Sequence, residues 1–254
     1  METGLITGSV ETYVEEDQEE KGQAASLEGQ PRQATQHGAR LTDTPAAPPS
    51  GARLVELDLG GSHEPWARAG LHLDTDHRCD VVSLALLIDR FREPGLHGWA
   101  FSEVDTGDID GIPTRRAERS SRSQRATDAF TLDVVGVDHV VVMTPDLMRT
   151  SEALARATKA PLKRVREAGE SVRQAFHRVG DVVIEIVSSP QVAEGPARLW
   201  GFVLTVRSLE AAADHLGPDV LSPPKPAVQE GRMIATFRQA AGLGVPVALM
   251  NLPR

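Results

Sequence analysis

The stretch that decides the fold is GVDHVVVMTPDL, residues 136–147. It continues a β-branched run, residues 135–143, of the kind found in buried strands. Thr144 and Pro145 then fit the N-cap and first position of a helix, and apolar residues recur at helical spacing until Pro161. The sequence therefore predicts a strand followed by a short amphipathic helix.

This pattern continues and then repeats. Three strands are expected after the helix, at residues 162–166, 172–179 and 182–187, separated by turn-like residues. A second copy has a strand at 200–206, a helix between Ser208 and Gly217, and strands at 233–237 and 245–250. Aligning Leu147 with Leu209 sets a repeat of 62 residues. The sequence thus predicts two βαβββ modules, at 133–190 and 198–252, within a domain spanning 133–254.

The rest of the chain is less regular. A degenerate βαβββ-like module is expected at residues 51–104, with strands at 53–59, 81–87 and 96–101 and a helix capped by Ser62. Residues 105–132, rich in Arg and Ser, are predicted to be a polar linker, and residues 1–50 a disordered acidic tail. An unpaired module needs cover for its apolar sheet face. We therefore expect it to pack on the main pair or to form a homodimer.

Composition narrows the class of protein. The tail holds nine acidic and three basic residues of a chain with net charge −9, so the body is nearly balanced and nucleic acid is not an expected partner. No apolar run approaches the roughly 18 residues of a membrane helix, and the N-terminus lacks a signal-peptide pattern, which favours a cytoplasmic protein with no membrane partner. Cys79 is the single cysteine, so any metal would need His and carboxylate ligands.

The segment GVDHVVVMTPDL and the later VGDVVIEIV, residues 179–187, resemble the opening and closing strands of a vicinal oxygen chelate module. This superfamily includes glyoxalases, bleomycin-resistance proteins and extradiol dioxygenases. The resemblance covers about residues 135–252. It implies an α+β fold in which paired βαβββ modules form an open, curled mixed-sheet cleft. It also implies a divalent metal, Mn, Fe, Co, Ni or Zn, with His139 and Glu185 as ligands from the first and last strands.

The second module departs from that pattern. The same offset places Gly201 where the other His would stand, and residues 247–250 contain no carboxylate. Half of the usual ligand set is therefore missing, and two ligands hold a divalent ion weakly. His177 is a conceivable third ligand, although strand alternation can place it on the other face.

Each candidate also has an ordinary structural interpretation. His139 is equally consistent with a core histidine that is hydrogen-bonded to Asp138. Glu185 is also consistent with an edge-strand residue that is exposed to water. If Glu185 instead faces a cleft, it is a candidate general base and the predicted catalytic residue. Arg164, Arg166 and Arg173 could clamp an anionic group within such a cleft, or be solvated strand residues. Trp200 could form an apolar wall of the cleft or belong to the core.

The resemblance implies a protein that acts on or binds a small molecule. One hypothesis is a divalent-metal-dependent lyase, isomerase or dioxygenase of glyoxalase type. The alternative is a metal-free binding protein that sequesters its ligand, as bleomycin-resistance relatives do, and the gap at Gly201 favours it. A third is a structural protein whose modules merely dimerise.

Overall fold

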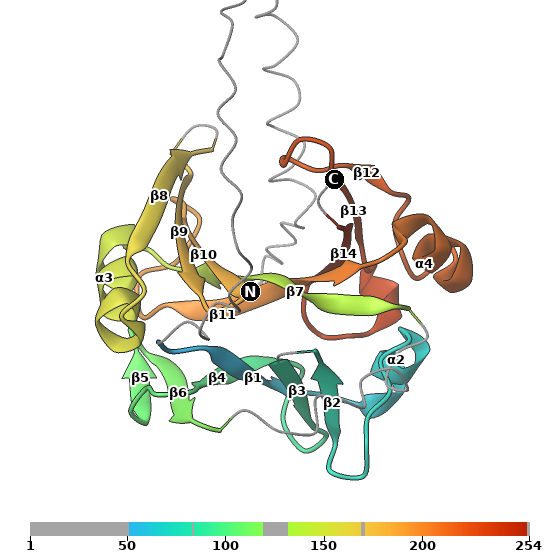
Figure 1. The fold of residues 1–254 in the computed structure, drawn as a ribbon, viewed down its shortest axis with the longest axis horizontal. Helices are drawn as coiled ribbons and strands as arrows, with labels where there is room; N and C mark the ends of the chain where they lie inside the picture. Colours follow the sequence, from blue (N-terminus) through green and yellow to red (C-terminus); the bar gives the residue numbers. More distant parts are fainter. Residues whose placement is uncertain (1–50, 83, 119–131, 169–170, 253–254) are drawn as a thin grey trace, which may run out of the picture.

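The computed structural model describes residues 51–82, 84–118, 132–168 and 171–252, which form two mixed β-sheets with few helices (Figure 1). The predicted tail, 1–50, and the linker residues 119–131 lie outside these ranges. Among the helices that are described, none is both long and apolar enough to span a membrane.

The C-terminal sheet is built from two βαβββ modules, as predicted. The first comprises β7 (Val134–Met143), α3 (Leu147–Thr158), β8 (Leu162–Glu167), β9 (Arg173–Val179) and β10 (Val182–Ser188). The second comprises β11 (Arg198–Val206), α4 (Leu209–Leu216), β12 (Lys225–Pro226), β13 (Met233–Thr236) and β14 (Val247–Asn251), with a 3₁₀ turn η3 (Gln239–Ala241). The strand order is β12-β13-β14-β11-β7-β10-β9-β8. The two modules join where β7 and β11 pair antiparallel, and each first strand runs parallel to its own last strand.

The start of α3 differs in detail from the sequence prediction. Asp146 is the N-cap, and its carboxylate accepts a hydrogen bond from the Arg149 N–H at 3.0 Å. Thr144 acts one step earlier, because its Oγ1 accepts from the Asp146 N–H. A carboxylate at this position also interacts favourably with the positive end of the helix dipole.

The N-terminal sheet has six strands and one helix: β1 (Leu54–Gly60), α2 (His63–Arg68), β2 (Arg78–Val81), β3 (Leu84–Asp89), β4 (Gly95–Phe101), β5 (Gly107–Ile109) and β6 (Ile112–Arg116). Their order is β2-β3-β1-β4-β6-β5. As in the larger sheet, two antiparallel central strands, β1 and β4, each run parallel to a later strand. The N-terminal sheet is therefore a reduced pair of modules, in which the second has no helix.

This arrangement differs from the single module predicted at 51–104. The stretch 81–87, expected as one strand, is interrupted by a tight turn at Val82, whose φ is 51°, so it divides between the hairpin strands β2 and β3. Strands β5 and β6 lie in the stretch predicted to be a linker, where Ile109, Ile112 and Thr114 are buried in an otherwise polar segment. Such short strands have too few apolar residues to show a period in the sequence.

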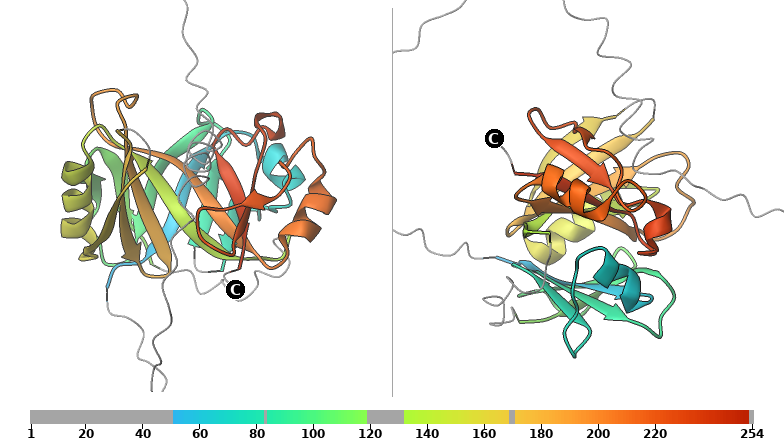
Figure 2. Two further views of the ribbon diagram at one scale, coloured as in Figure 1. Left: turned by 90° about the horizontal axis from the view of Figure 1, so that it is seen from above. Right: turned by 90° about the vertical axis from the view of Figure 1, so that its right-hand side faces the viewer.

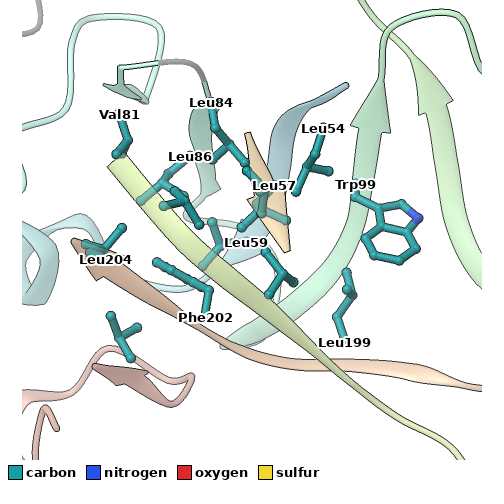
Figure 3. Close-up of a cluster of buried hydrophobic side chains, with 14 of the residues drawn as sticks. Leu54, Leu57, Leu59, Val81, Leu84, Leu86, Trp99, Leu199, Phe202 and Leu204 are labelled. Carbon is teal, nitrogen blue, oxygen red and sulfur yellow. The ribbon is translucent and has the colours of Figure 1, made fainter. Parts of the chain in front are cut away.

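The two sheets pack against each other through one shared hydrophobic core (Figure 3). Leu57 and Leu59 from the N-terminal sheet lie near Phe202 of β11, and Trp99 lies near Leu199 of the same strand. Trp66 of α2 also stacks on Phe202, with ring centroids 6.3 Å apart. Figure 2 shows the smaller sheet as a separate layer against the back of the larger one. Packing of the N-terminal strands on the main pair, one of the two predicted outcomes, is thus what the chain adopts.

Candidate functional site

The face of the C-terminal sheet that points away from the N-terminal layer carries a cleft. Strands β8–β10 and β12–β14 rise as two walls on either side of β7 and β11 (Figure 1). The cleft has a volume of about 160 Å³, roughly ten times the room that one water molecule needs. Most of its lining is apolar, and this set includes Val141, Met143, Val187, Trp200, Val203, Ile234, Ala248 and Met250. A small organic ligand would fit this shape and chemistry.

A β-bulge places Asp138 beside His139, which lines the polar end of the cleft. His139 pairs with Val203 of β11, whereas Leu204 pairs with Val137, so Asp138 is the extra residue on β7. The Asp138 carboxylate accepts a hydrogen bond from His139 Nδ1 at 2.9 Å. Bulges re-aim side chains in this way and are frequent beside functional sites.

Glu185 of β10 completes this polar end. Its Oε2 lies 3.6 Å from His139 Nε2, and each side chain is 15% exposed. Gln174 of β9 donates a hydrogen bond from Nε2 to Glu185 Oε1 at 2.8 Å. The structure therefore brings the two predicted site residues together in one cleft, from two adjacent parallel strands.

Opposing influences set the charge state of this group. Burial lowers the pKa of His139, but the hydrogen bond to Asp138 and the charge of Glu185 outweigh burial and raise it above its usual value. Burial raises the pKa of Asp138, yet hydrogen bonds from His139 and Arg232 bring it below the usual range. Arg232 is 6% exposed and also donates to the Asn251 carbonyl and to Gln229. A buried chain of polar contacts thus runs from the second module into the first.

The other residues singled out in the sequence divide between the cleft and the core. Trp200, Arg164 and Arg166 line the cleft, and the Arg164 guanidinium lies 4.7 Å from the centre of the Phe176 ring. His177 does not line the cleft. It is fully buried on the other face of β9, where Nδ1 donates to the Ala160 carbonyl and Nε2 accepts from Ser151 Oγ. His177 is therefore a core histidine and not a third ligand.

In the second module, backbone atoms fill the space at Gly201, the position that would correspond to His139. A Cβ at Gly201 would lie 2.4 Å from the Pro246 carbonyl oxygen, so no side chain fits there without backbone movement. The facing strand presents Ala248 and Met250, which pack with Val203 and Ile234. The second half of the cleft is thus an apolar wall.

The chemistry of the donors decides how far a metal fits. His139 and Glu185 are close enough to be neighbouring ligands of one ion, and a histidine whose other ring nitrogen is held by a carboxylate is a common metal ligand. Across the described ranges, however, no group of three or more His, Cys, Asp or Glu side chains could hold a metal. The residues present therefore fit half of the four-ligand centre of the resemblance and do not fit the whole.

The sequence analysis did not single out two residues that contact the site, Gln174 and Arg232. Gln174 follows the alternation that places Phe176 in the cleft, so its face was predictable, but its hydrogen bond to Glu185 depends on the β9–β10 register. Arg232 precedes β13 and gives no local signal, because it is separated from Asp138 by 94 residues.

Comparison with known proteins supports the fold. No known family profile and no curated protein matches the sequence. A mutant of 4-hydroxymandelate synthase from Streptomyces coelicolor superposes with a TM-score of 0.55 at 11% identity, covering 78% of this chain and 92% of that chain. Methylmalonyl-CoA epimerase from Mycobacterium tuberculosis covers 49% of this chain and 92% of its own, with 16% identity and a TM-score of 0.42.

The synthase belongs to the vicinal oxygen chelate superfamily. At such low identity the likeness concerns the fold alone. The α+β architecture, the paired modules and the superposition on the synthase identify this chain as a protein with the vicinal oxygen chelate fold.

Proposed function

We propose that this chain binds a small organic molecule in the cleft of its C-terminal sheet. The observation that carries the proposal is the placement of His139 and Glu185 together in a cleft whose lining is mostly apolar. Ligand sites commonly combine an apolar lining with a few convergent polar groups. The apolar body of the ligand would lie on Val203, Ile234 and Met250, and its polar group would meet Glu185.

The residues of the chain assign roles within this site. Glu185 can accept hydrogen bonds from a bound molecule and can take up a proton from it, because its carboxylate lines the cleft. Asp138 and Arg232 fix the His139 ring, and the apolar wall limits the access of water. These features suit binding with or without a chemical step.

Binding is tested with a library of small aromatic and aliphatic compounds, screened by ligand-observed NMR in the presence of a chelator. We expect hits whose affinity falls at least tenfold in Glu185→Gln. Glu152→Gln is a matched control, because Glu152 lies on the exposed side of α3 and should leave affinity unchanged. A protein that binds none of the compounds, or whose hits are equally affected by both variants, would contradict the proposal.

A metal-assisted lyase, isomerase or dioxygenase is the second candidate. The spacing of 3.6 Å between His139 and Glu185, together with the Asp138 contact, favours it. A divalent ion held there would act as a Lewis acid on oxygen atoms of the substrate. Glu185 and His139 would hold the ion, and the substrate or water would supply the remaining ligands, since the second module offers none.

Metal content of the purified protein, measured by inductively coupled plasma mass spectrometry, separates the two candidates. The enzyme hypothesis expects near-stoichiometric Mn, Fe, Co, Ni or Zn in the wild type and loss of the ion in both His139→Ala and Glu185→Gln. A wild-type protein that is empty and takes up none of these ions on addition leaves metal-free binding as the function.

A further inference from the structure

The charged side chains that line the cleft are mostly basic. Among the described residues of its lining, Arg164 and Arg166 of β8 carry positive charge, and Glu185 is the single acid. This contrasts with the whole chain, whose net charge is −9. Cations gathered in a cleft with apolar walls attract anions and repel other cations. The charge of the lining therefore favours a ligand with an anionic group.

Strand register sets the distance between these charges. Phe176 of β9 lies opposite Glu185 on β10 and opposite Arg164 on β8, so the three residues form one row across the wall of the cleft. Adjacent strands are about 4.8 Å apart, which places the backbones of Arg164 and Glu185 about 10 Å from each other. Glu185 is engaged on its own side of the row, because it accepts a hydrogen bond from Gln174. Arg164 and Glu185 are thus two separate polar positions with Phe176 between them.

The guanidinium of Arg164 is held over a ring but has no acid partner. Its Cζ lies over the ring of Phe176, 4.7 Å from the ring centre. Such a contact stabilises the cation yet offers no oxygen to its N–H donors. Within the described ranges, Arg164 forms no ion pair and no side-chain hydrogen bond, and the acid of the same strand, Glu167, pairs with Arg173 at 3.2 Å. The donors of Arg164 are therefore open to a molecule in the cleft.

Exposure alone does not give Arg164 a ligand, because water satisfies an exposed guanidinium. Its surroundings distinguish it from an ordinary surface arginine, since it lines the same cleft as the apolar side chains of Ile234 and Met250. A ligand whose apolar body is buried in this cleft can bring a polar end beside Arg164. A carboxylate fits best there, because its two oxygens match two parallel N–H donors of a guanidinium.

We propose that Arg164 binds the carboxylate of a small organic anion, whose apolar body lies across Phe176 and along the apolar wall of the cleft. This inference rests on the proposed binding function and specifies its ligand class: small carboxylic acids with an apolar body, bound as anions. The carboxylate has a position of its own, separated by Phe176 from the group that meets Glu185. Arg164 is thus a binding residue of the site in addition to His139 and Glu185.

Three probes with the same apolar body test this inference: 3-phenylpropanoate, 3-phenylpropanamide and 3-phenylpropylamine. At neutral pH they are an anion, a neutral molecule and a cation. The full chain is stripped of metal with a chelator and dialysed, because an ion on His139 and Glu185 would also attract a carboxylate. Ligand-observed NMR titration gives the three dissociation constants. We expect the carboxylate to bind about tenfold more tightly than the amide, and the amine no more tightly than the amide.

Two variants that remove the same charge locate the preference. Arg164→Gln should lower the affinity for the carboxylate to that for the amide. It should leave the affinity for the amide unchanged, which also reports an intact cleft. Arg156→Gln is the matched control, because Arg156 lies on α3 outside the cleft lining and its side chain is 71% exposed. This control should keep the tenfold preference.

The possible failures differ in their pattern. A wild-type protein that binds the amide or the amine as tightly as the carboxylate overturns the inference, while cleft binding stands. An equal loss of preference in Arg156→Gln and Arg164→Gln also overturns it, since the effect would then come from net charge and not from the cleft. If none of the three probes binds, the proposed function fails together with the inference.

Discussion

Arg232 joins the two modules at the level of single side chains. Its guanidinium donates to Asp138 on β7, to Gln229 and to the Asn251 carbonyl at the end of β14. Because Asp138 in turn holds His139, a residue of the second module orients a site residue of the first. The second module thus orients a site residue of the first module, although it contributes no metal ligand.

Replacing Arg232 with Met should lower the free energy of unfolding by about 3 kcal/mol, because it leaves the buried Asp138 carboxylate without its cationic partner. Urea unfolding followed by circular dichroism measures the change. Arg207→Met is the control, since the Arg207–Asp133 pair is 65% exposed on both sides and should contribute less than about 1 kcal/mol. Equal losses in the two variants would contradict the central place given to Arg232.

His177 should make stability depend on pH. Burial lowers its pKa below the usual 6.5, and the hydrogen bond to Ala160 offsets only part of this. Below about pH 6.5 the unfolded chain therefore takes up a proton that the folded protein does not, so the contribution of His177 to stability is lost as pH falls.

The comparison of wild type with His177→Gln isolates this effect from the other histidines. At pH 7.5 the variant should be clearly less stable than wild type, because it loses contacts with Ser151 and Ala160. At pH 5.5 the gap should narrow, since only the wild type has the proton-uptake penalty. Urea unfolding at both values measures it, and a gap that stays constant would show that His177 does not titrate as inferred.

At the scale of elements, the β5–β6 turn connects the N-terminal sheet with α3. The Asp110 carboxylate accepts from Arg149 Nε at 2.8 Å and from Thr150 Oγ1, both in the first turn of α3. Its backbone carbonyl also accepts from the Ala197 N–H. A segment that had the composition of a linker therefore docks on the first module.

Asp110→Ala should lower stability by about 2 kcal/mol, because the buried hydroxyl of Thr150 loses an acceptor and the helix start loses a negative charge. The nearby Asp108→Ala is the matched control. Among the described residues, Asp108 accepts a hydrogen bond from the Gly111 N–H alone, within its own turn, and it is exposed, so its loss should cost less. Thermal unfolding measures the stability of the two variants. A larger loss of stability in Asp108→Ala than in Asp110→Ala would exclude the docking role of Asp110.

At the scale of the whole molecule, the two sheets share one core and should unfold together. Leu57 in the N-terminal sheet is fully buried in the same cluster as Phe202 and Leu204, which form the back of the cleft-bearing sheet. The homodimer considered in the sequence analysis stays an untested prediction. The apolar sheet face that suggested it is covered within the chain.

Leu57→Ala should destabilise the protein by about 3 kcal/mol through lost burial and the cavity left behind. The transition should remain single, and ligand binding in the distant cleft should be lost at the same midpoint. Phe91→Ala is the control, because Phe91 is 84% exposed. Two separate transitions, observed by calorimetry, would show that the sheets unfold independently.

The sequence by itself determined most local elements of the C-terminal modules. Alternating and β-branched runs predicted every strand of these modules except the short β12, and the offset that aligned Leu147 with Leu209 predicted their repeat. The resemblance then pointed to His139 and Glu185, and the parallel pairing of β7 with β10 brings them together. Such features depend on neighbours in the chain, whose spacing the sequence displays directly.

Only the tertiary structure decided the rest. The reduced modules of the N-terminal sheet, the docking of Asp110, and the contacts of Arg232 and Gln174 all join residues far apart in the chain or fixed by strand register. The closure of Gly201 by the Pro246 carbonyl belongs to the same group. Periodicity indicates which face a side chain occupies, but its partner across that face follows from how sheets pair and pack, and those contacts leave no local pattern.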